Sequence, residues 1–95
     1  MPEQRGCVVA SYDITDTRRR TKVAQLLEGY GERVQYSVFE LWVTREEMGA
    51  LRKKLASLVV EEGSIRFYPL CAACEKKRRV EGKGAPTTLE EVIIL

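Results

Sequence analysis

The sequence predicts an α+β fold in which strands and helices follow one another in the order β-α-β-β-α-β. Three observations support this prediction. The 95 residues are enough for one domain with a small core. Apolar runs of β-strand character alternate with segments whose apolar residues recur at helical spacing. Two strand segments are adjacent and form a hairpin. With right-handed crossovers, this order gives the ferredoxin-like arrangement, an antiparallel sheet with both helices on one face.

The first strand and the first helix are predicted from residues 7–31. Residues 7–10 are continuously apolar, which predicts a buried strand over residues 7–12. Thr15 or Asp16 can cap the helix that follows. The apolar residues of this helix recur at helical spacing: Val23, Leu26, Leu27 and Tyr30. The helix ends at residues 29–31, where two glycines allow the left-handed exit conformation.

A hairpin is predicted over residues 33–43, because this run is too long and too β-branched for one simple strand. We expect a short strand, a tight turn near Tyr36 and Ser37, and a longer strand. The second helix then begins with a capping box, in which the Thr44 hydroxyl and the Glu47 side chain satisfy free backbone amides reciprocally.

The apolar stripe of the second helix consists of Met48, Leu51, Leu55 and Leu58. Residues 61–63 (Glu-Glu-Gly) end this helix, and residues 64–70 alternate as the last strand, with Ile65 and Phe67 on one face. These elements make up a predicted ferredoxin-like domain over residues 1–82.

Residues 83–95 form a predicted C-terminal extension. Residues 79–82 have the pattern of a short strand, and residues 83–86 form a loop before the apolar segment 91–95. An exposed apolar strand at an edge invites aggregation, so this last segment should pair with a sheet. Because the core is small, we expect the strand to be exchanged across a homodimer.

The net charge of +2 does not by itself indicate a nucleic-acid-binding protein. Basic residues nevertheless cluster at 18–20, 52–54 and 76–79. For any single cluster, a solvated face is the simpler interpretation. The sequence shows neither the apolar core of a signal peptide nor a stretch long enough for a membrane span, so we expect a cytoplasmic protein without a membrane partner.

Cys71 and Cys74 form a Cys-X-X-Cys motif in a chain that contains no histidine. One such pair cannot supply four zinc ligands unless two chains share the ion. The sequence gives little support for a thioredoxin-like role either, because a thioredoxin motif should follow the first strand and open a long helix. Cys7 lies in a predicted strand and should pack as a small apolar residue.

Three segments together resemble one family. They are Tyr12-Asp13-Ile14, then Asp16 with the arginines at 18–20, then Gly31-x-Arg33-Val34-Gln35-x-Ser37-Val38-Phe39-Glu40. The chain resembles the CRISPR-associated small nuclease family, the second of the two proteins of the spacer-acquisition machinery. The resemblance extends over nearly the whole chain and includes Tyr68-Pro69-Leu70-Cys71. It implies a ferredoxin-like fold and a homodimer whose sheets meet.

The resemblance also implies a divalent ion held between the protomers by one aspartate from each, which by position is Asp13. Tyr12, Arg20, Arg33 and Phe39 are carried over as further residues associated with nuclease activity. The family is described as metal-dependent endonucleases acting on RNA or DNA. It implies an alternative role as well, in which the dimer bridges two CRISPR-associated integrase dimers and lies along duplex DNA without cutting it.

The chemistry of the residues is compatible with a metal-dependent nuclease. A chain without histidine has few general bases, whereas metal-bound water needs only hard oxygen ligands. Mg²⁺, or another divalent cation such as Mn²⁺, keeps several waters and is satisfied by one or two carboxylates, and a two-fold axis would supply Asp13 twice. Arg20 and Arg33 can hold a phosphate through planar bidentate contacts.

Each of these residues also has a structural interpretation. Asp13 can be a turn or capping residue after a strand, and Asp16 is better explained as a helix cap. Tyr12 and Phe39 can be packing residues, and Arg33 can form a surface ion pair. A regulatory module that binds a metabolite is a more distant alternative, since the chain has no glycine-rich phosphate loop.

Overall fold

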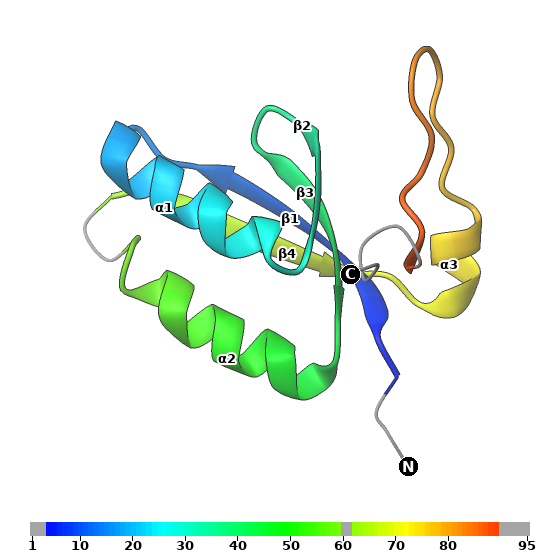
Figure 1. Cartoon of the computed structure of the whole chain (residues 1–95), viewed down its shortest axis with the longest axis horizontal. Coiled ribbons are helices and arrows are strands. Elements are labelled where there is room, and N and C mark those ends of the chain that lie inside the picture. Colours follow the sequence, from blue (N-terminus) through cyan, green and yellow to red (C-terminus); the bar gives the residue numbers. More distant parts are fainter. Residues whose placement is uncertain (1–3, 60–61, 90–95) are drawn as a thin grey trace.

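The computed structural model describes residues 4–59 and 62–89. Its elements in chain order are β1 (Gly6–Asp13), α1 (Thr17–Glu28), β2 (Gly31–Gln35), β3 (Val38–Val43), α2 (Arg45–Ala56), β4 (Ser64–Pro69) and α3 (Ala72–Lys76) (Figure 1). The first six follow the predicted order. Within the described ranges, no helix is long and apolar enough to cross a membrane.

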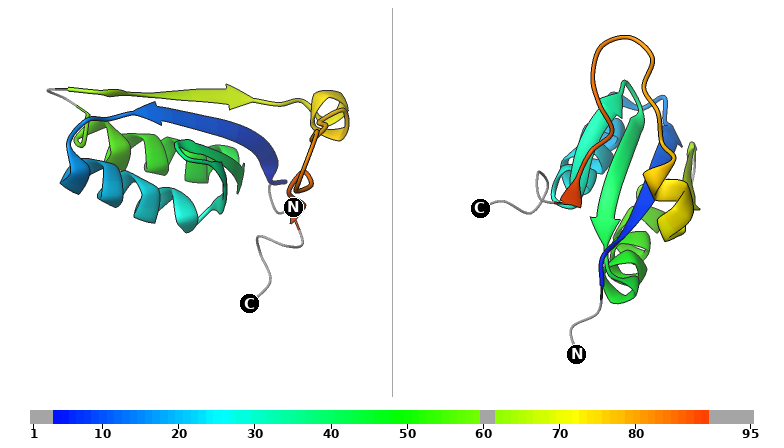
Figure 2. Two further views of the ribbon diagram at one scale, coloured as in Figure 1. Left: turned by 90° about the horizontal axis from the view of Figure 1, so that it is seen from above. Right: turned by 90° about the vertical axis from the view of Figure 1, so that its right-hand side faces the viewer.

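The four strands form one sheet in the order β2-β3-β1-β4. Each neighbouring pair is antiparallel, and β1 lies in the middle, with Ala10 opposite Phe39 of β3 and Phe67 of β4. Both long helices cover the same face of the sheet (Figure 2). The predicted ferredoxin-like arrangement is therefore confirmed.

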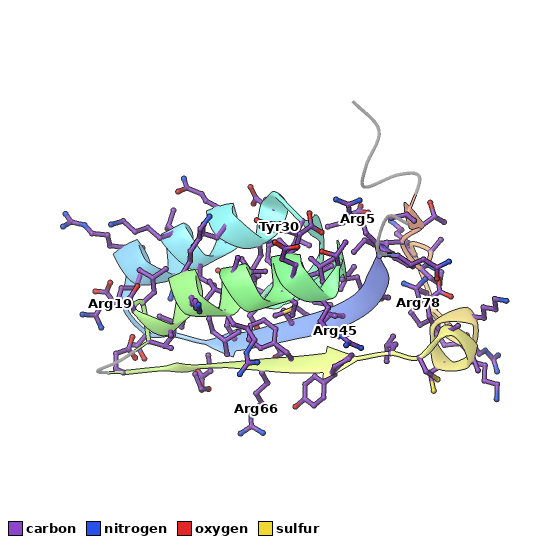
Figure 3. The ribbon with its side chains drawn as sticks, turned by 90° about the horizontal axis from the view of Figure 1, so that it is seen from below. Arg5, Arg19, Tyr30, Arg45, Arg66 and Arg78 are labelled. Atoms are coloured by element: carbon purple, nitrogen blue, oxygen red, sulfur yellow. The ribbon has the colours of Figure 1, made fainter. Side chains whose placement is uncertain are left out.

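The core lies between this sheet face and the two helices. Strand residues alternate between the two faces, so Val8, Ala10 and Tyr12 of β1 point toward the helices. The largest fully buried apolar side chains are Phe39, Leu27, Leu41, Leu51, Leu55 and Val23. We call the other face, which neither α1 nor α2 covers, the open face. Arg66 of β4 points away from the helices on this face (Figure 3).

Helices α1 and α2 begin at the capping residues that the sequence predicts. Asp16 caps α1, because its carboxylate accepts a hydrogen bond from the Arg19 backbone N–H at 2.8 Å. Thr44 and Glu47 form the complete capping box of α2, with reciprocal bonds of 3.0 and 2.9 Å. The turn at Tyr36 and Ser37 is also confirmed.

Four details differ from the sequence-based predictions. The left-handed exit expected at residues 29–31 is absent, because Gly29 ends α1 with a φ of −69° and neither Gly29 nor Gly31 has a positive φ. Helix α2 ends at Ala56, before Leu58, whose N–H closes a tighter turn onto the Leu55 carbonyl. Residues 79–82 form no strand. The five-residue helix α3 was not predicted, because it is too short to show an apolar period. The predicted terminal strand 91–95 lies outside the described residues, so its exchange and the domain division at residue 82 stay predictions.

Arg78, which follows α3, contacts strand β3 on the open face and also binds the chain near Thr87 (Figure 3). Its guanidinium lies 2.6 Å from the Glu40 carboxylate, donates to the Thr87 carbonyl at 2.8 Å, and sits 5.5 Å from the centre of the Trp42 ring. The Trp42 indole N–H in turn donates to the buried Thr87 hydroxyl at 3.1 Å. This arrangement, which we call the Arg78 anchor, covers one end of the open face.

We expect Arg78→Ala to lower the free energy of unfolding by about 3 kcal/mol, because it leaves the Glu40 carboxylate largely buried without its cation. The matched control is Arg79→Ala, since Arg79 pairs with Glu81 while their side chains are 83% and 87% exposed. The control should change stability by less than about 0.5 kcal/mol. Urea unfolding measures both. Equal effects of the two substitutions would show that the Arg78 anchor contributes no more than a surface ion pair.

Candidate functional site

Asp13 is the last residue of β1 and is exposed. It pairs with Ser64 of β4, one position beyond the pair formed by Tyr12 and Ile65. Because Tyr12 and Ile65 face the helices, alternation places the Asp13 side chain on the open face. No described residue forms a hydrogen bond or an ion pair with its carboxylate. The carboxylate is therefore available to a ligand.

The backbone after Asp13 is held by side chains from two directions. Arg20 of α1 donates to the Ile14 carbonyl at 3.2 Å and to the Thr15 carbonyl at 3.3 Å. Glu62 accepts from the backbone N–H groups of Thr15 at 3.2 Å and Asp16 at 3.1 Å. These backbone hydrogen bonds from Asp16 and Thr15 lower the pKa of the Glu62 carboxyl. The loop after β1 is thus fixed by an arginine on its carbonyls and a carboxylate on its amides.

Gly63 allows the chain to pass close to this loop. Its φ is +92°, and a Cβ built there would lie 2.9 Å from the Asp13 carbonyl oxygen. A side chain at this position would push against the backbone of Asp13. The absence of a side chain at Gly63 therefore lets the backbone of residue 63 pack directly against the backbone of Asp13.

Three of the other predicted site residues meet in one cavity of about 380 Å³ on the helix-covered side. The residues lining it are Tyr12, Arg20, Thr21, Ala24, Gln25, Glu28, Arg33 and Tyr36. They come from β1, α1, β2 and the turn between β2 and β3. We call this space the arginine cavity.

The fifth predicted residue, Phe39, lies beneath the arginine cavity and is fully buried. Its ring centre is 6.3 Å from that of Tyr12, and the Arg33 guanidinium lies 5.3 Å over the Phe39 ring. Arg33 also lies 3.7 Å from Glu28 of α1, so the predicted surface ion pair is present while the guanidinium still lines the cavity. Phe39 supports Arg33 and Tyr12 by packing.

The structure thus divides the predicted site between the two faces of the sheet. Asp13 lies on the open face, whereas Tyr12, Arg20 and Arg33 line the arginine cavity on the other side. Within residues 4–59 and 62–89, no group of three or more His, Cys, Asp or Glu side chains is arranged to hold a metal ion. Asp13 is therefore not part of such a group among these residues.

Two residues of the site do not stand out in the sequence. Tyr36 is predicted only as a turn residue, but its side chain is 84% exposed at the rim of the arginine cavity. Glu62 is predicted only to end a helix, but it caps the loop after β1 from 46 residues away. An aromatic residue at the tip of a tight turn is a signal that could have indicated Tyr36. No local pattern indicates Glu62, because its partners are distant in sequence.

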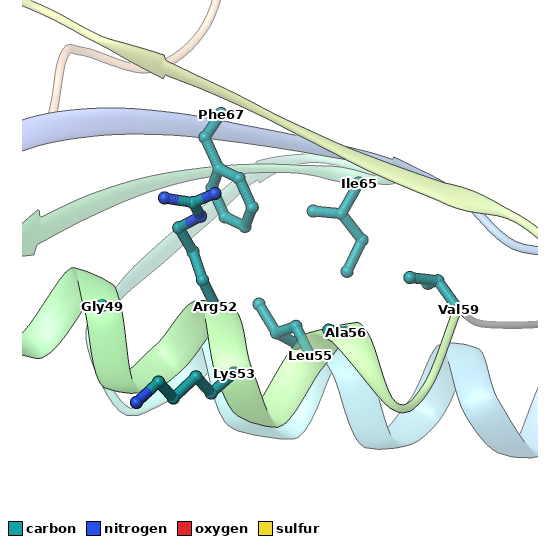
Figure 4. Close-up of a pocket in the computed structure, with 8 residues that line it drawn as sticks. All are labelled: Gly49, Arg52, Lys53, Leu55, Ala56, Val59, Ile65 and Phe67. Atoms are coloured by element: carbon teal, nitrogen blue, oxygen red, sulfur yellow. The ribbon is translucent and has the colours of Figure 1, made fainter.

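A second hollow lies between α2 and β4 and has a volume of about 590 Å³. Leu55 of α2 faces Ile65 and Phe67 of β4 across it, and Arg52 and Lys53 lie at its border (Figure 4). None of the predicted site residues lines this groove.

Comparison with known proteins assigns the chain to a family. The family described as CRISPR associated protein Cas2 matches residues 7–78. A CRISPR-associated endoribonuclease Cas2 of Synechocystis sp. is 56% identical over 63 residues, which cover 65% of this chain and 68% of the relative. A CRISPR-associated endoribonuclease Cas2 of Chloroflexus aurantiacus is 44% identical over 88 residues, which cover 90% of this chain and 95% of the relative.

A solved structure has the same fold. A chain of a partial Cas6-RT-Cas1--Cas2 complex superposes with a TM-score of 0.70 at 32% identity, covering 85% of this chain and 94% of that chain. The family match extends from Cys7 in β1 to Arg78 and so includes all five predicted site residues. The protein therefore belongs to the CRISPR-associated Cas2 family.

Proposed function

We propose that the protein is a metal-dependent endonuclease of the CRISPR adaptation machinery that hydrolyses phosphodiester bonds of single-stranded RNA or double-stranded DNA. The observation that carries this proposal is the Asp13 carboxylate, which is exposed on the open face without a partner among the described residues while its backbone is fixed. The two relatives are called endoribonucleases, which supports RNA as one substrate.

The residues fit a magnesium or manganese ion better in a homodimer than in a single chain. One carboxylate alone makes a weak site, whereas two carboxylates and several waters satisfy a hard cation, so we infer that Asp13 of each of two copies would hold one shared ion. The open face supports such pairing, because it presents Val9, Val38 and the half-exposed Tyr68. When bound, the ion would lower the pKa of a water and neutralise charge on the phosphate.

The arginine cavity would bind the nucleic-acid backbone. Arg20 and Arg33 offer planar donors to a phosphate, and Tyr12 lines the same cavity. Because Asp13 lies on the opposite sheet face, we infer that the cavity contacts a different phosphate from the one that is cleaved. Phe39 would act on Arg33 by packing and would not touch the substrate.

A cleavage assay across metal conditions tests the proposal. Labelled single-stranded RNA and duplex DNA are incubated with purified protein in Mg²⁺, in EDTA, and in Mn²⁺ restored after EDTA. We expect cleavage in Mg²⁺, a fall of at least about 100-fold in EDTA, and recovery with Mn²⁺. Undiminished cleavage in EDTA, or no cleavage with any divalent metal, would overturn the proposed activity.

A second candidate function is a non-catalytic adaptor that binds duplex DNA and a CRISPR-associated integrase. Two observations favour it: a similar solved chain belongs to a complex that contains Cas1, and basic side chains cluster on the exposed side of α2 at residues 52–54. In this role the Asp13 carboxylate would not be needed.

Neutralising the α2 cluster tests the adaptor. We expect the combined change Arg52→Gln, Lys53→Gln and Lys54→Gln to weaken duplex binding and to flatten its dependence on salt. The log–log slope should fall by about 0.9 for each DNA phosphate that the variant no longer neutralises. The matched control is Asp13→Asn, which should leave duplex and integrase binding unchanged. A triple variant with an unchanged slope would exclude this surface from duplex binding.

A further inference from the structure

The Cys-X-X-Cys motif lies outside the Asp13 site and the arginine cavity. Cys71 is the N-cap of α3, and Cys74 lies one turn further along the same helix. Both cysteines are exposed, and the Cys71 sulfur accepts a hydrogen bond from the Cys74 backbone N–H at 3.4 Å. Two accessible thiols are therefore held beside one another at a fixed place in the fold.

We propose that Cys71 and Cys74 form a reversible dithiol–disulfide site that reacts with low-molecular-weight disulfides such as glutathione disulfide. The two residues sit within one helical turn, the spacing of redox-active Cys-X-X-Cys pairs. This site is not a thioredoxin domain, because the motif follows the last strand of the sheet and opens a helix of five residues. It does not depend on the proposed nuclease activity.

The two thiols have different roles in the exchange. The pKa of Cys71 is lowered, chiefly because its sulfur accepts a hydrogen bond from the Cys74 backbone N–H and also one from the Cys74 thiol. The same thiol hydrogen bond raises the pKa of Cys74. Cys71 is therefore the attacking thiolate, and Cys74 is the thiol that resolves the intermediate.

The exchange is balanced in two steps. The Cys71 thiolate attacks one sulfur of the small disulfide, which forms a mixed disulfide and releases one thiolate that takes up a proton. Cys74 then loses its proton and attacks the Cys71 sulfur, which closes the Cys71–Cys74 bond and releases the second thiol. Two cysteines are oxidised by two electrons, and one disulfide is reduced to two thiols.

Neighbouring structure keeps both ends of this segment in place. Before the motif, the Leu70 backbone N–H donates to the Cys7 carbonyl at 2.9 Å. After it, Arg78 donates through Nε to the Glu75 carbonyl at 2.8 Å and continues into the Arg78 anchor. Closure of the disulfide is thus expected to occur within the fold, without release of α3 from the sheet.

Cys7 provides an internal control for reactivity. Its side chain is only 2% exposed, and burial raises its pKa to about 11. In the folded protein it should therefore stay reduced while the exposed pair reacts.

The test is to equilibrate the full chain with graded ratios of reduced and oxidised glutathione and to measure intact mass and free thiols. We expect an intramolecular disulfide, seen as a decrease of about 2 Da and the disappearance of two free thiols, which reverses on adding excess reduced glutathione. Cys74→Ser should trap a mixed disulfide on Cys71, and Cys71→Ser should react about 10-fold more slowly. Cys7→Ser should behave like the unchanged protein.

Three results would overturn the proposal. One is a folded protein that keeps all three thiols free across the series. Another is disulfide formation only between chains, seen as covalent dimers on a non-reducing gel. The third is a Cys71→Ser variant that reacts as fast as Cys74→Ser, which would show that the hydrogen bonds to Cys71 do not activate it.

Discussion

Asp13→Asn is expected to abolish metal-dependent cleavage, with a fall in kcat/KM of at least about 100-fold for RNA or DNA. The amide keeps the size of the side chain but removes the negative charge that a hard cation needs. Because two copies would share one ion, the substitution removes both carboxylate ligands of the homodimer at once. Initial rates at saturating Mg²⁺ measure the effect, and circular dichroism and thermal unfolding check that the fold is unchanged.

The matched control for this variant is Asp16→Asn. Asp16 lies three residues further along and caps α1 through the Arg19 backbone N–H, and asparagine caps helices about as well as aspartate. Asp16→Asn should therefore keep cleavage within a few-fold of the unchanged protein. Full cleavage by Asp13→Asn, or equal decreases in both variants, would remove Asp13 from the proposed site.

Phe39→Ala is expected to lower the free energy of unfolding by about 3–5 kcal/mol, because it opens a cavity in the centre of the core. Phe39 is completely buried between the sheet and the helices. Domains of this size are stabilised by only about 5–15 kcal/mol, so much of the variant should be unfolded at moderate temperature. Urea unfolding measures the decrease.

Phe39→Leu separates packing from catalysis. Leucine refills most of the space, so we expect a decrease of about 1–2 kcal/mol in the free energy of unfolding and cleavage by the folded fraction close to that of the unchanged protein. This follows from the position of the Phe39 ring under the Arg33 guanidinium, where it supports the arginine cavity without facing it. If a stable Phe39→Leu protein cleaved about 100-fold more slowly, Phe39 would have a direct role instead.

Local sequence patterns predicted those parts of the fold that depend on neighbouring residues. The capping box of Thr44 and Glu47, the cap at Asp16 and the turn at Tyr36 and Ser37 each involve residues a few positions apart. The short helix α3 shows no apolar period, because none of its described residues is buried. Its cysteine cap is unusual, so the usual capping signals were absent.

The candidate site was only partly predictable, because strand alternation is a local pattern whereas other contacts of the site join residues far apart in the chain. Tyr12 and Asp13 are adjacent in sequence, but strand alternation separates them onto opposite faces of the sheet. This separation follows from the period of the strand alone and was predictable from the sequence. The hydrogen bonds that Glu62 accepts from the loop after β1 were not, because they join residues far apart in the chain.

The number of metal ions bound per chain tests the shared site at Asp13 most directly. Mn²⁺ can be titrated into the purified protein and its free concentration followed by electron paramagnetic resonance, together with the mass of the assembly in solution. We predict one tightly bound ion for every two chains, held by a homodimer and absent in Asp13→Asn. One ion for each chain, or binding that persists in Asp13→Asn, would contradict a site built from Asp13 of two copies.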